Sequence, residues 1–257
     1  CEMPLFRDGN LSYRASLLHA LHHTILTASR LPDRKDFSIR RRARPHRALV
    51  QHRPWLVLSI MAGIAFPLLE ETALGGLWLM AIKASAVGFL ALYAAQRTRG
   101  LRAALFVLAL ALSAVGDAAI QLSFVAGGAA FFASHIAAIF FYRRYLRPEP
   151  SVARKWATIL LLVSVPAVSW LLSGDILIGL YGLGLGGMAM AAWLSLFSQW
   201  RVGLGALLFV ASDWLIFSRM GPVDLAPLPD LLIWPLYYIG QLLIATGVVQ
   251  TLRRFRR

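Results

Sequence analysis

The stretch LRAALFVLALALSAVGDAAIQL, residues 101–122, decides the fold of this chain. It is an apolar run of the length that an α-helix needs to cross a bilayer, about 17–25 residues. Asp117 is its only acidic residue. A carboxyl group in lipid is paired, protonated or used in a function, because an isolated charge is costly there. The stretch therefore predicts a membrane helix and marks Asp117 as a candidate functional residue.

The composition of the whole chain agrees with a membrane protein. Of its 257 residues, 58% are hydrophobic and only 15% are charged, which is too apolar for a soluble domain of this length. The net charge of +14 raises the question of a nucleic-acid partner. The arginines, however, lie in short clusters between apolar runs, as in membrane loops, so we expect no nucleic-acid binding. Cys1 is the only cysteine, which excludes an internal disulfide and a cysteine-based metal site.

The apolar residues fall into eight segments that predict an all-α, polytopic membrane bundle of eight transmembrane helices. The segments cover approximately residues 55–69, 73–95, 101–122, 124–142, 156–173, 176–196, 202–218 and 230–250. The first segment is short and follows basic residues, so a signal peptide is the alternative. The following sequence, EETALGG, lacks a small-x-small cleavage site, and we therefore interpret the segment as a span.

The segment before the first span has a different composition. Residues 1–53 are arginine-rich, with RRRAR at 40–44, and we expect a basic, disordered tail. Within it, residues 11–26 fit a short amphipathic helix on an anionic membrane surface, although an extension without function fits as well. We expect the membrane domain to cover residues 54–252, followed by a basic C-terminal tail, 253–257.

The distribution of arginine and lysine predicts the orientation. Basic residues precede the first span, follow the last, and occur in every second connection: Arg97 to Arg102, Arg143 to Lys155, and Arg201. The connections between them, at 70–72, 122–124, 173–175 and 221–230, contain no cation, although Arg219 lies at the edge of the last one. Because cytoplasmic loops carry the excess of Lys and Arg, both termini are predicted to be cytoplasmic. We expect a multi-pass protein of the plasma (inner) membrane.

A glycine-rich stretch requires separate interpretation. GLGLGG, residues 182–187, contains the G-x-G-x-x-G pattern of dinucleotide-binding folds. That fingerprint needs a strand before it and a helix after it, whereas this stretch lies inside an apolar span. We interpret Gly182 and Gly186 as a G-x-x-x-G pair that allows close packing of helices.

Few polar residues lie inside the predicted spans, and two of them are acids at matching depth. At about 1.5 Å per residue, Asp117 lies roughly 8 Å and Asp213 roughly 9 Å from the outer ends of their helices. Lys83, His135 and Gln241 lie around 17 Å deep, near the midplane. The other polar candidates are Ser113, Ser212, Tyr237 and Tyr238.

Each of these residues has a structural alternative. Either aspartate is a possible partner of Lys83, His135 is a possible core histidine, and Tyr237 with Gln241, four residues apart, is a possible bridge between helices. Two acids at one depth favour a function, since each charge costs about 2.5–3.5 kcal/mol or more at the bilayer centre. No close ligand spacing such as H-x-x-x-H is present, so we expect no metal site.

Four stretches in order resemble the YhhN-like lysoplasmalogenases. They are SAVGDAAIQL (113–122), FFASHIAAIFFY (131–142), FVASDWLIF (209–217) and LYYIGQLLI (236–244). The resemblance covers about residues 55–250 and excludes the basic tail. One departure is Lys83–Ala84, where the family pattern has Lys–Pro, which leaves the geometry of the second helix in question.

The resemblance implies hydrolysis of the vinyl ether of lysoplasmalogens to a fatty aldehyde and a glycerophospho-alcohol. It implies a lysophospholipid substrate among the membrane lipids, no cofactor, and Asp117 and Asp213 as the catalytic acids. The remaining polar residues inside the spans would support the site or bind substrate. The chemistry agrees, because a vinyl ether is cleaved by protonation of its outer alkene carbon, and burial favours the neutral, proton-donating form of a carboxyl group.

Two other functions fit the same residues. Membrane acids with a histidine also form proton relays in small proton-coupled transporters, and a non-catalytic lipid-binding protein is the third possibility. The sequence leaves open the head group of the substrate, the leaflet from which it enters, the oligomeric state, and which aspartate is the acid and which the base.

The predicted orientation is testable with reporter fusions. Reporters placed after Pro148 and after Arg257 should report a cytoplasmic location, because both points follow basic connections. A reporter within residues 221–230 should report the opposite side. A cytoplasmic signal from 221–230 in a protein that inserts and accumulates normally would contradict the eight-span arrangement.

Overall fold

The described part of the chain consists of eight α-helices and one π-helical turn. A computed structural model describes residues 53–70, 72 and 76–255, all of which belong to one compact unit. The predicted tail, 1–53, lies outside the described residues except for Arg53. In chain order the helices are α3 Pro54–Glu70, α4 Leu77–Arg97, α5 Leu101–Ala119, α6 Phe124–Arg143, α7 Val152–Ser173, α8 Ile176–Leu194, η1 Gln199–Gly203, α9 Leu204–Ser218 and α10 Leu228–Arg254.

Each of the eight predicted apolar segments coincides with one of these α-helices, so the prediction of an all-α helical bundle is confirmed. Six helices are long and apolar enough to cross a membrane, with η1 and α9 counted together. The other two, α3 and α5, are apolar but shorter. The structure therefore belongs to the class of helical membrane bundles, while the number of eight spans remains a prediction.

The helices begin or end a few residues away from the predicted apolar segments where polar residues belong to the terminal turn of a helix. The predicted span 156–173 begins earlier, at Val152, because Ser151 caps the helix. Its Oγ accepts a hydrogen bond from the backbone N–H of Arg154 at 3.4 Å. Arg154 therefore lies in the first turn, which a search for apolar residues leaves out. α5 ends at Ala119, before the predicted residue 122, and Ser123 caps the next helix in the same way.

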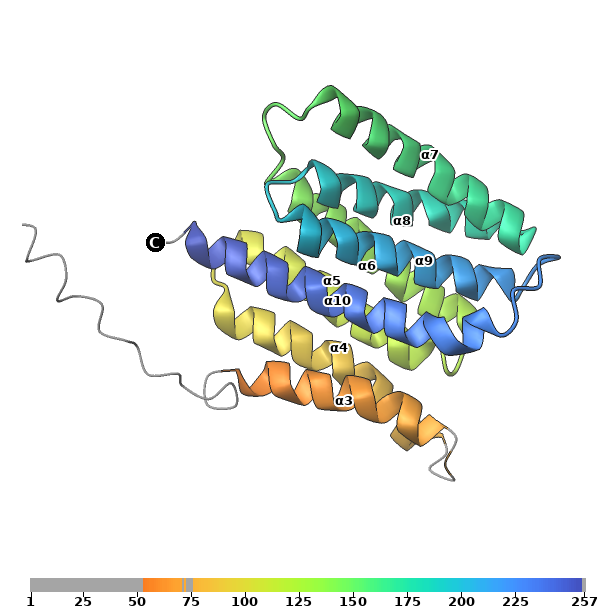
Figure 1. Cartoon of the computed structure of the whole chain (residues 1–257). Helices are drawn as coiled ribbons and strands as arrows, with labels where there is room; N and C mark the ends of the chain where they lie inside the picture. Colours follow the sequence, from red (N-terminus) through yellow and green to blue (C-terminus); the bar gives the residue numbers. More distant parts are fainter. Residues whose placement is uncertain (1–52, 71, 73–75, 256–257) are drawn as a thin grey trace, which may run out of the picture. The chain divides into compact units, whose positions relative to one another are not determined.

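The packing order follows the chain for most helices, with α10 as the main exception. α3 packs on α4, α4 on α5, α5 on α6, and α7 on α8. The C-terminal helix α10 packs on both α9 and α4, and α6 packs on α8. In Figure 1, α10 accordingly lies between α9 and α4. This return of α10 brings helices from both halves of the sequence together.

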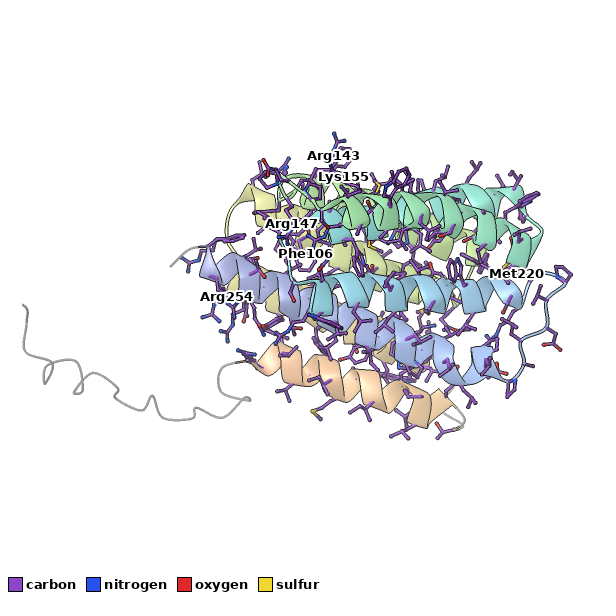
Figure 2. The ribbon with its side chains drawn as sticks, turned by 45° about the horizontal axis from the view of Figure 1, so that its top comes forward. Phe106, Arg143, Arg147, Lys155, Met220 and Arg254 are labelled. Atoms are coloured by element: carbon purple, nitrogen blue, oxygen red, sulfur yellow. The ribbon has the colours of Figure 1, made fainter. Side chains whose placement is uncertain are left out.

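The two ends of the bundle differ in charge. Because short connections join antiparallel neighbours, every second connection lies at the same end. In Figure 2, Arg143, Arg147, Lys155 and Arg254 lie at one end of the bundle and Met220 lies at the other. We call the first the basic end. The second, which holds the connections 120–123, 174–175 and 219–227, is called the distal end.

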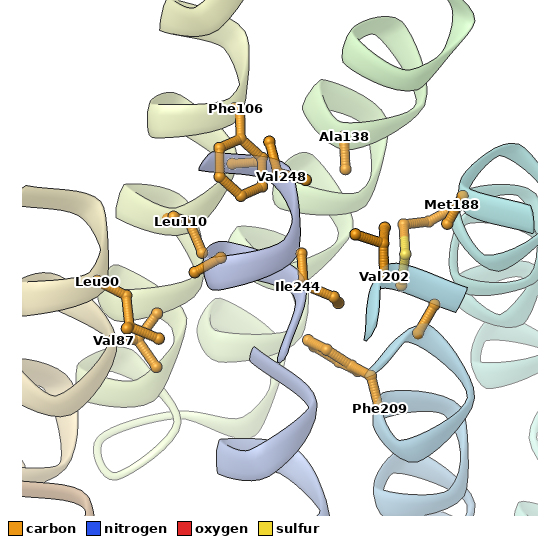
Figure 3. Close-up of a cluster of buried hydrophobic side chains, with 14 of the residues drawn as sticks. Val87, Leu90, Phe106, Leu110, Ala138, Met188, Val202, Phe209, Ile244 and Val248 are labelled. Atoms are coloured by element: carbon orange, nitrogen blue, oxygen red, sulfur yellow. The ribbon is translucent and has the colours of Figure 1, made fainter. Parts of the chain in front are cut away.

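Apolar side chains fill the centre of the bundle and also cover much of its outside. Figure 3 shows the central cluster, in which Leu110, Val202 and Val248 come from α5, η1 and α10. On the outside, Met61 of α3 and Leu160 of α7 are 61% and 66% exposed. Large exposed apolar surfaces on soluble proteins are rare, and here they are the surfaces that lipid would cover.

Glycines bring two pairs of helices into backbone contact. A Cβ atom on Gly182 would lie 2.7 Å from the Cα of Pro166, and one on Gly186 would lie 3.1 Å from the carbonyl oxygen of Leu161. The predicted G-x-x-x-G contact is thus confirmed, with α7 as the partner of α8. Gly205 of α9 and Gly240 of α10 form a second contact.

We predict that Gly240→Ala destabilises the bundle. The added Cβ would lie 2.7 Å from the carbonyl oxygen of Gly205, which is backbone and cannot rotate away. Overpacking of this kind costs about 1–3 kcal/mol. The control is Gly88→Ala in α4, where the nearest atom would be 3.9 Å away. Thermal unfolding in detergent should show a lower midpoint for Gly240→Ala only, and an equal response of the two variants would contradict the contact.

Candidate active site

A cavity of about 630 Å³ opens toward the distal end of the bundle. Its mouth includes residues at helix termini, such as Glu70 of α3, Asp175 before α8 and Asp230 of α10. Its inner part is lined by Asp117, Asp213 and other side chains from the interior. Both predicted catalytic aspartates therefore reach one cavity, although they come from α5 and α9.

Asp117 is held by a tyrosine from the C-terminal helix. Its side chain is 2% exposed, and the Tyr237 hydroxyl donates a hydrogen bond of 2.7 Å to its Oδ2. Lys83 and Asp213 are both close enough for their charges to act on Asp117, and Lys83 acts more strongly. Tyr237 was predicted as a polar residue of the site or as a bridge between helices together with Gln241, and in the structure its hydroxyl bonds to Asp117.

Asp213 is held by a tyrosine that the sequence analysis missed. The Tyr181 hydroxyl donates to Asp213 Oδ2 at 2.9 Å, and His135 Nε2 lies 3.0 Å from the same hydroxyl oxygen. Tyrosine has one hydroxyl hydrogen. While Tyr181 donates it to Asp213, the contact to His135 requires that Nε2 carries a hydrogen and donates to the tyrosine. The three residues then form a chain of hydrogen bonds from α6 through α8 to α9.

A signal for Tyr181 was present in the sequence. It lies five residues after Ile176, the first residue of α8, and hence about 8 Å below the distal end of the helix. That is the depth estimated for Asp117 and Asp213. The glycines around Tyr181 indicate helix packing, but its depth alone places its hydroxyl group level with the two aspartates.

Lys83 lines the same cavity without forming an ion pair. Its Nζ lies 5.2 Å from the ring centre of Phe66 and 5.8 Å from that of Trp234. Both distances are within the range of cation–π attraction. Among the described residues the only ion pair is between Arg219 and Asp230, at the mouth. The structural alternative, a salt bridge from Lys83 to an aspartate, therefore does not occur in the described structure.

A second group of predicted residues lies behind the cavity. The Gln241 Nε2 donates to Ser113 Oγ at 3.1 Å, and Ser113 Oγ lies 2.9 Å from Ser134 Oγ. Ser134 in turn donates to the carbonyl oxygen of Ala109 at 2.8 Å. These residues connect α10, α5 and α6 and do not line the cavity, so their contact with the aspartates is indirect.

The two remaining predicted residues, Ser212 and Tyr238, form hydrogen bonds between helices. Ser212 lines the cavity and donates to the carbonyl oxygen of Ile233 at 2.9 Å. The Tyr238 hydroxyl lies 2.9 Å from Ser59 Oγ, outside the cavity lining. Within the described residues, no group of three His, Cys, Asp or Glu side chains is arranged to hold a metal ion.

Comparison with known proteins gives the family. Residues 78–248 match the YhhN family, so this helical membrane bundle belongs to it. The matched region contains both aspartates and both tyrosines, and it excludes α3, which the resemblance had included. No curated protein and no solved structure matches the chain.

We predict that Tyr181 and Asp213 are energetically coupled. Hydrogen bonds to charged groups contribute about 1.5–3 kcal/mol. In a double-mutant cycle with Tyr181→Phe and Asp213→Ala, the coupling energy in unfolding should therefore exceed about 1 kcal/mol. The comparison cycle pairs Tyr181→Phe with Asp117→Ala, whose tyrosine partner is Tyr237. Equal coupling in both cycles, or additivity in the first, would contradict the specific pairing.

Proposed function

We propose that this protein hydrolyses the vinyl ether bond of lysoplasmalogens, releasing a fatty aldehyde and a glycerophospho-alcohol. The observation that carries the proposal is the meeting of Asp117 and Asp213 in one buried cavity. Membership of the YhhN family supports a hydrolase that acts within the membrane. The predicted arrangement of eight spans with cytoplasmic termini in the inner membrane is part of the proposal.

The reaction requires one proton donor and one proton acceptor. A neutral carboxyl group protonates the outer alkene carbon, and the resulting oxocarbenium ion is stabilised by the other, ionised carboxylate. Water then adds to the cation and gives its proton to the second carboxylate. When the hemiacetal collapses to aldehyde and alcohol, its hydroxyl proton passes to the first carboxylate and the second carboxyl group protonates the leaving oxygen, which restores both aspartates. Two buried carboxyl groups that line one cavity suit this division, because one stays protonated more readily when the other is ionised.

The tyrosines have complementary tasks in this scheme. Each donates a hydrogen bond to one aspartate, Tyr237 to Asp117 and Tyr181 to Asp213. A hydroxyl that donates to a carboxylate stabilises its ionised form and fixes its orientation. Lys83, which has no carboxylate partner in the described structure, adds positive charge to the same cavity. We assign these residues to positioning and leave open which aspartate is the acid.

The cavity also suits a single-chain lipid. Its volume of about 630 Å³ lies within the range of small-molecule sites, about 300–1,000 Å³. Buried aromatic side chains such as Phe66, Phe131 and Trp234 line the cavity, where the alkenyl chain would lie. Charged side chains gather at the mouth, where Arg219 pairs with Asp230. This gradient would hold the ether near the aspartates and leave the head group at the distal end.

The chain of hydrogen bonds from His135 to Asp213 is the observation that favours the second candidate, a proton-coupled transporter. Buried acids and histidines of this kind carry protons in pumps and transporters. A transporter would show no aldehyde release from a vinyl-ether lipid, so the same assay separates the two functions.

The proposal is tested with purified protein and a 1-alkenyl-lysophospholipid, with fatty aldehyde as the measured product. Asp117→Asn and Asp213→Asn should each lower turnover per folded protein at least about a hundredfold, since a positioned acid or base contributes about 10²–10⁴-fold. The double variant should lose little more, because residues that act as a unit are not additive.

The matched control is Asp224→Asn, which removes an exposed carboxylate outside the cavity lining and should keep normal turnover. The corresponding 1-alkyl lipid, which has no alkene to protonate, should remain intact. A well-folded Asp117→Asn protein with near-normal hydrolysis would remove Asp117 from the mechanism. Absence of aldehyde with the unaltered protein would reject the function.

A further inference from the structure

A second cavity, of about 300 Å³, lies at the basic end of the bundle, opposite the mouth of the first. Four segments form it: the end of α4 with the following turn, the start of α5, the residues after α6, and the end of α10. Its lining includes Arg97, Thr98, Arg99, Tyr145, Leu252 and Phe255. None of these residues belongs to the candidate active site.

The arginines at this cavity have no carboxylate partner in the described part of the chain. Arg219–Asp230, at the distal end, is the only ion pair found there. Arg97 lies close enough to Arg253 and Arg53 for their positive charges to act on it. Like charges held together without a counter-charge are unfavourable, and an anion bound among them would relieve the repulsion.

Helix ends supply only part of the missing negative charge. The C-termini of α4, α6 and α10 and the N-terminus of α5 lie at this end, and each is equivalent to about half an elementary charge, negative at a C-terminus and positive at an N-terminus. Together they correspond to about one negative charge, whereas Arg97 and Arg99 with the neighbouring Arg53 and Arg253 carry four positive charges. The cavity therefore stays positive after the helix ends are counted.

The lining of the cavity also includes apolar side chains. The rings of Tyr145 and Phe255 stack with centres 6.4 Å apart, and Leu252 belongs to the same lining. A cavity lined by arginines together with aromatic and aliphatic side chains suits an amphipathic anion. The boundary of the membrane with water, where the ends of spanning helices lie, contains such molecules in abundance, namely anionic phospholipids.

We propose that this second cavity binds the phosphate group of an anionic phospholipid, with Arg97 and Arg99 as its ligands. Guanidinium groups recognise phosphate by paired, charge-assisted hydrogen bonds. Tyr145 and Phe255 would contact the glycerol and the upper acyl chain. This site is separate from the cavity with the aspartates, and its existence does not depend on the proposed hydrolase function.

The experiment measures bound lipid by native mass spectrometry of the full-length protein in detergent with added phosphatidylglycerol or phosphatidylcholine. The unaltered protein should retain phosphatidylglycerol in preference to phosphatidylcholine. Arg97→Gln/Arg99→Gln should lower phosphatidylglycerol affinity at least about tenfold, because two charge-assisted contacts are lost. The single variant Arg99→Gln, altered at an exposed position, should show a smaller loss and tests the site if the double variant does not fold.

The matched control is Arg143→Gln/Arg144→Gln, which removes the same charge from exposed residues at the same end, outside the cavity lining. It should keep the affinity of the unaltered protein. Equal loss in both double variants would show general attraction to a basic surface and would overturn the proposal. Displacement of the lipid by millimolar glycerol 3-phosphate or inorganic phosphate would also overturn it, because the site would then take soluble phosphate.

Discussion

The arrangement of the bundle depends on the requirement that a carboxyl group inside an apolar protein has a hydrogen-bond donor. Asp117 and Asp213 are almost fully buried, and each charge at the centre of a bilayer costs about 2.5–3.5 kcal/mol or more. A hydrogen bond to a charged group contributes about 1.5–3 kcal/mol to stability. The donors, Tyr237 and Tyr181, come from α10 and α8, so four helices must take specific rotations about their axes for both bonds to form.

The same requirement explains why Asp117 and Asp213 lie between two different environments. Toward the basic end, apolar side chains such as Leu110 and Val248 exclude water from the centre of the bundle (Figure 3). Toward the distal end, the cavity reaches charged residues at helix termini, including Glu70 and Asp175. A carboxyl group between them lies in a medium of low polarity, and the cavity connects it to the distal end of the bundle. Both conditions are needed for a neutral acid that exchanges protons.

The sequence predicted the helices well because membrane spans are defined by length and hydropathy, which are local properties. Counting residues along a helix also placed Asp117 and Asp213 at matching depths, and in the structure both line one cavity. The rotation of each helix about its axis is set by contacts between distant segments, such as the packing of α10 on α4. Local sequence patterns do not contain this information. The depth of Tyr181 can likewise be counted from the sequence, but its two partners lie on other helices and cannot.

Lys83 forms no ion pair with either aspartate in the described structure, although its charge acts on Asp117. A lysine in a salt bridge with a buried aspartate would hold that carboxyl group in its ionised form and occupy its oxygen atoms. Here the ammonium group lies over the rings of Phe66 and Trp234, while in the described structure the side chains bonded to the aspartates are tyrosines. Hydroxyl groups can donate or accept, and they therefore tolerate both the neutral and the ionised aspartate. Partners of this kind suit the proposed mechanism, in which an aspartate gives up a proton and recovers it in each cycle.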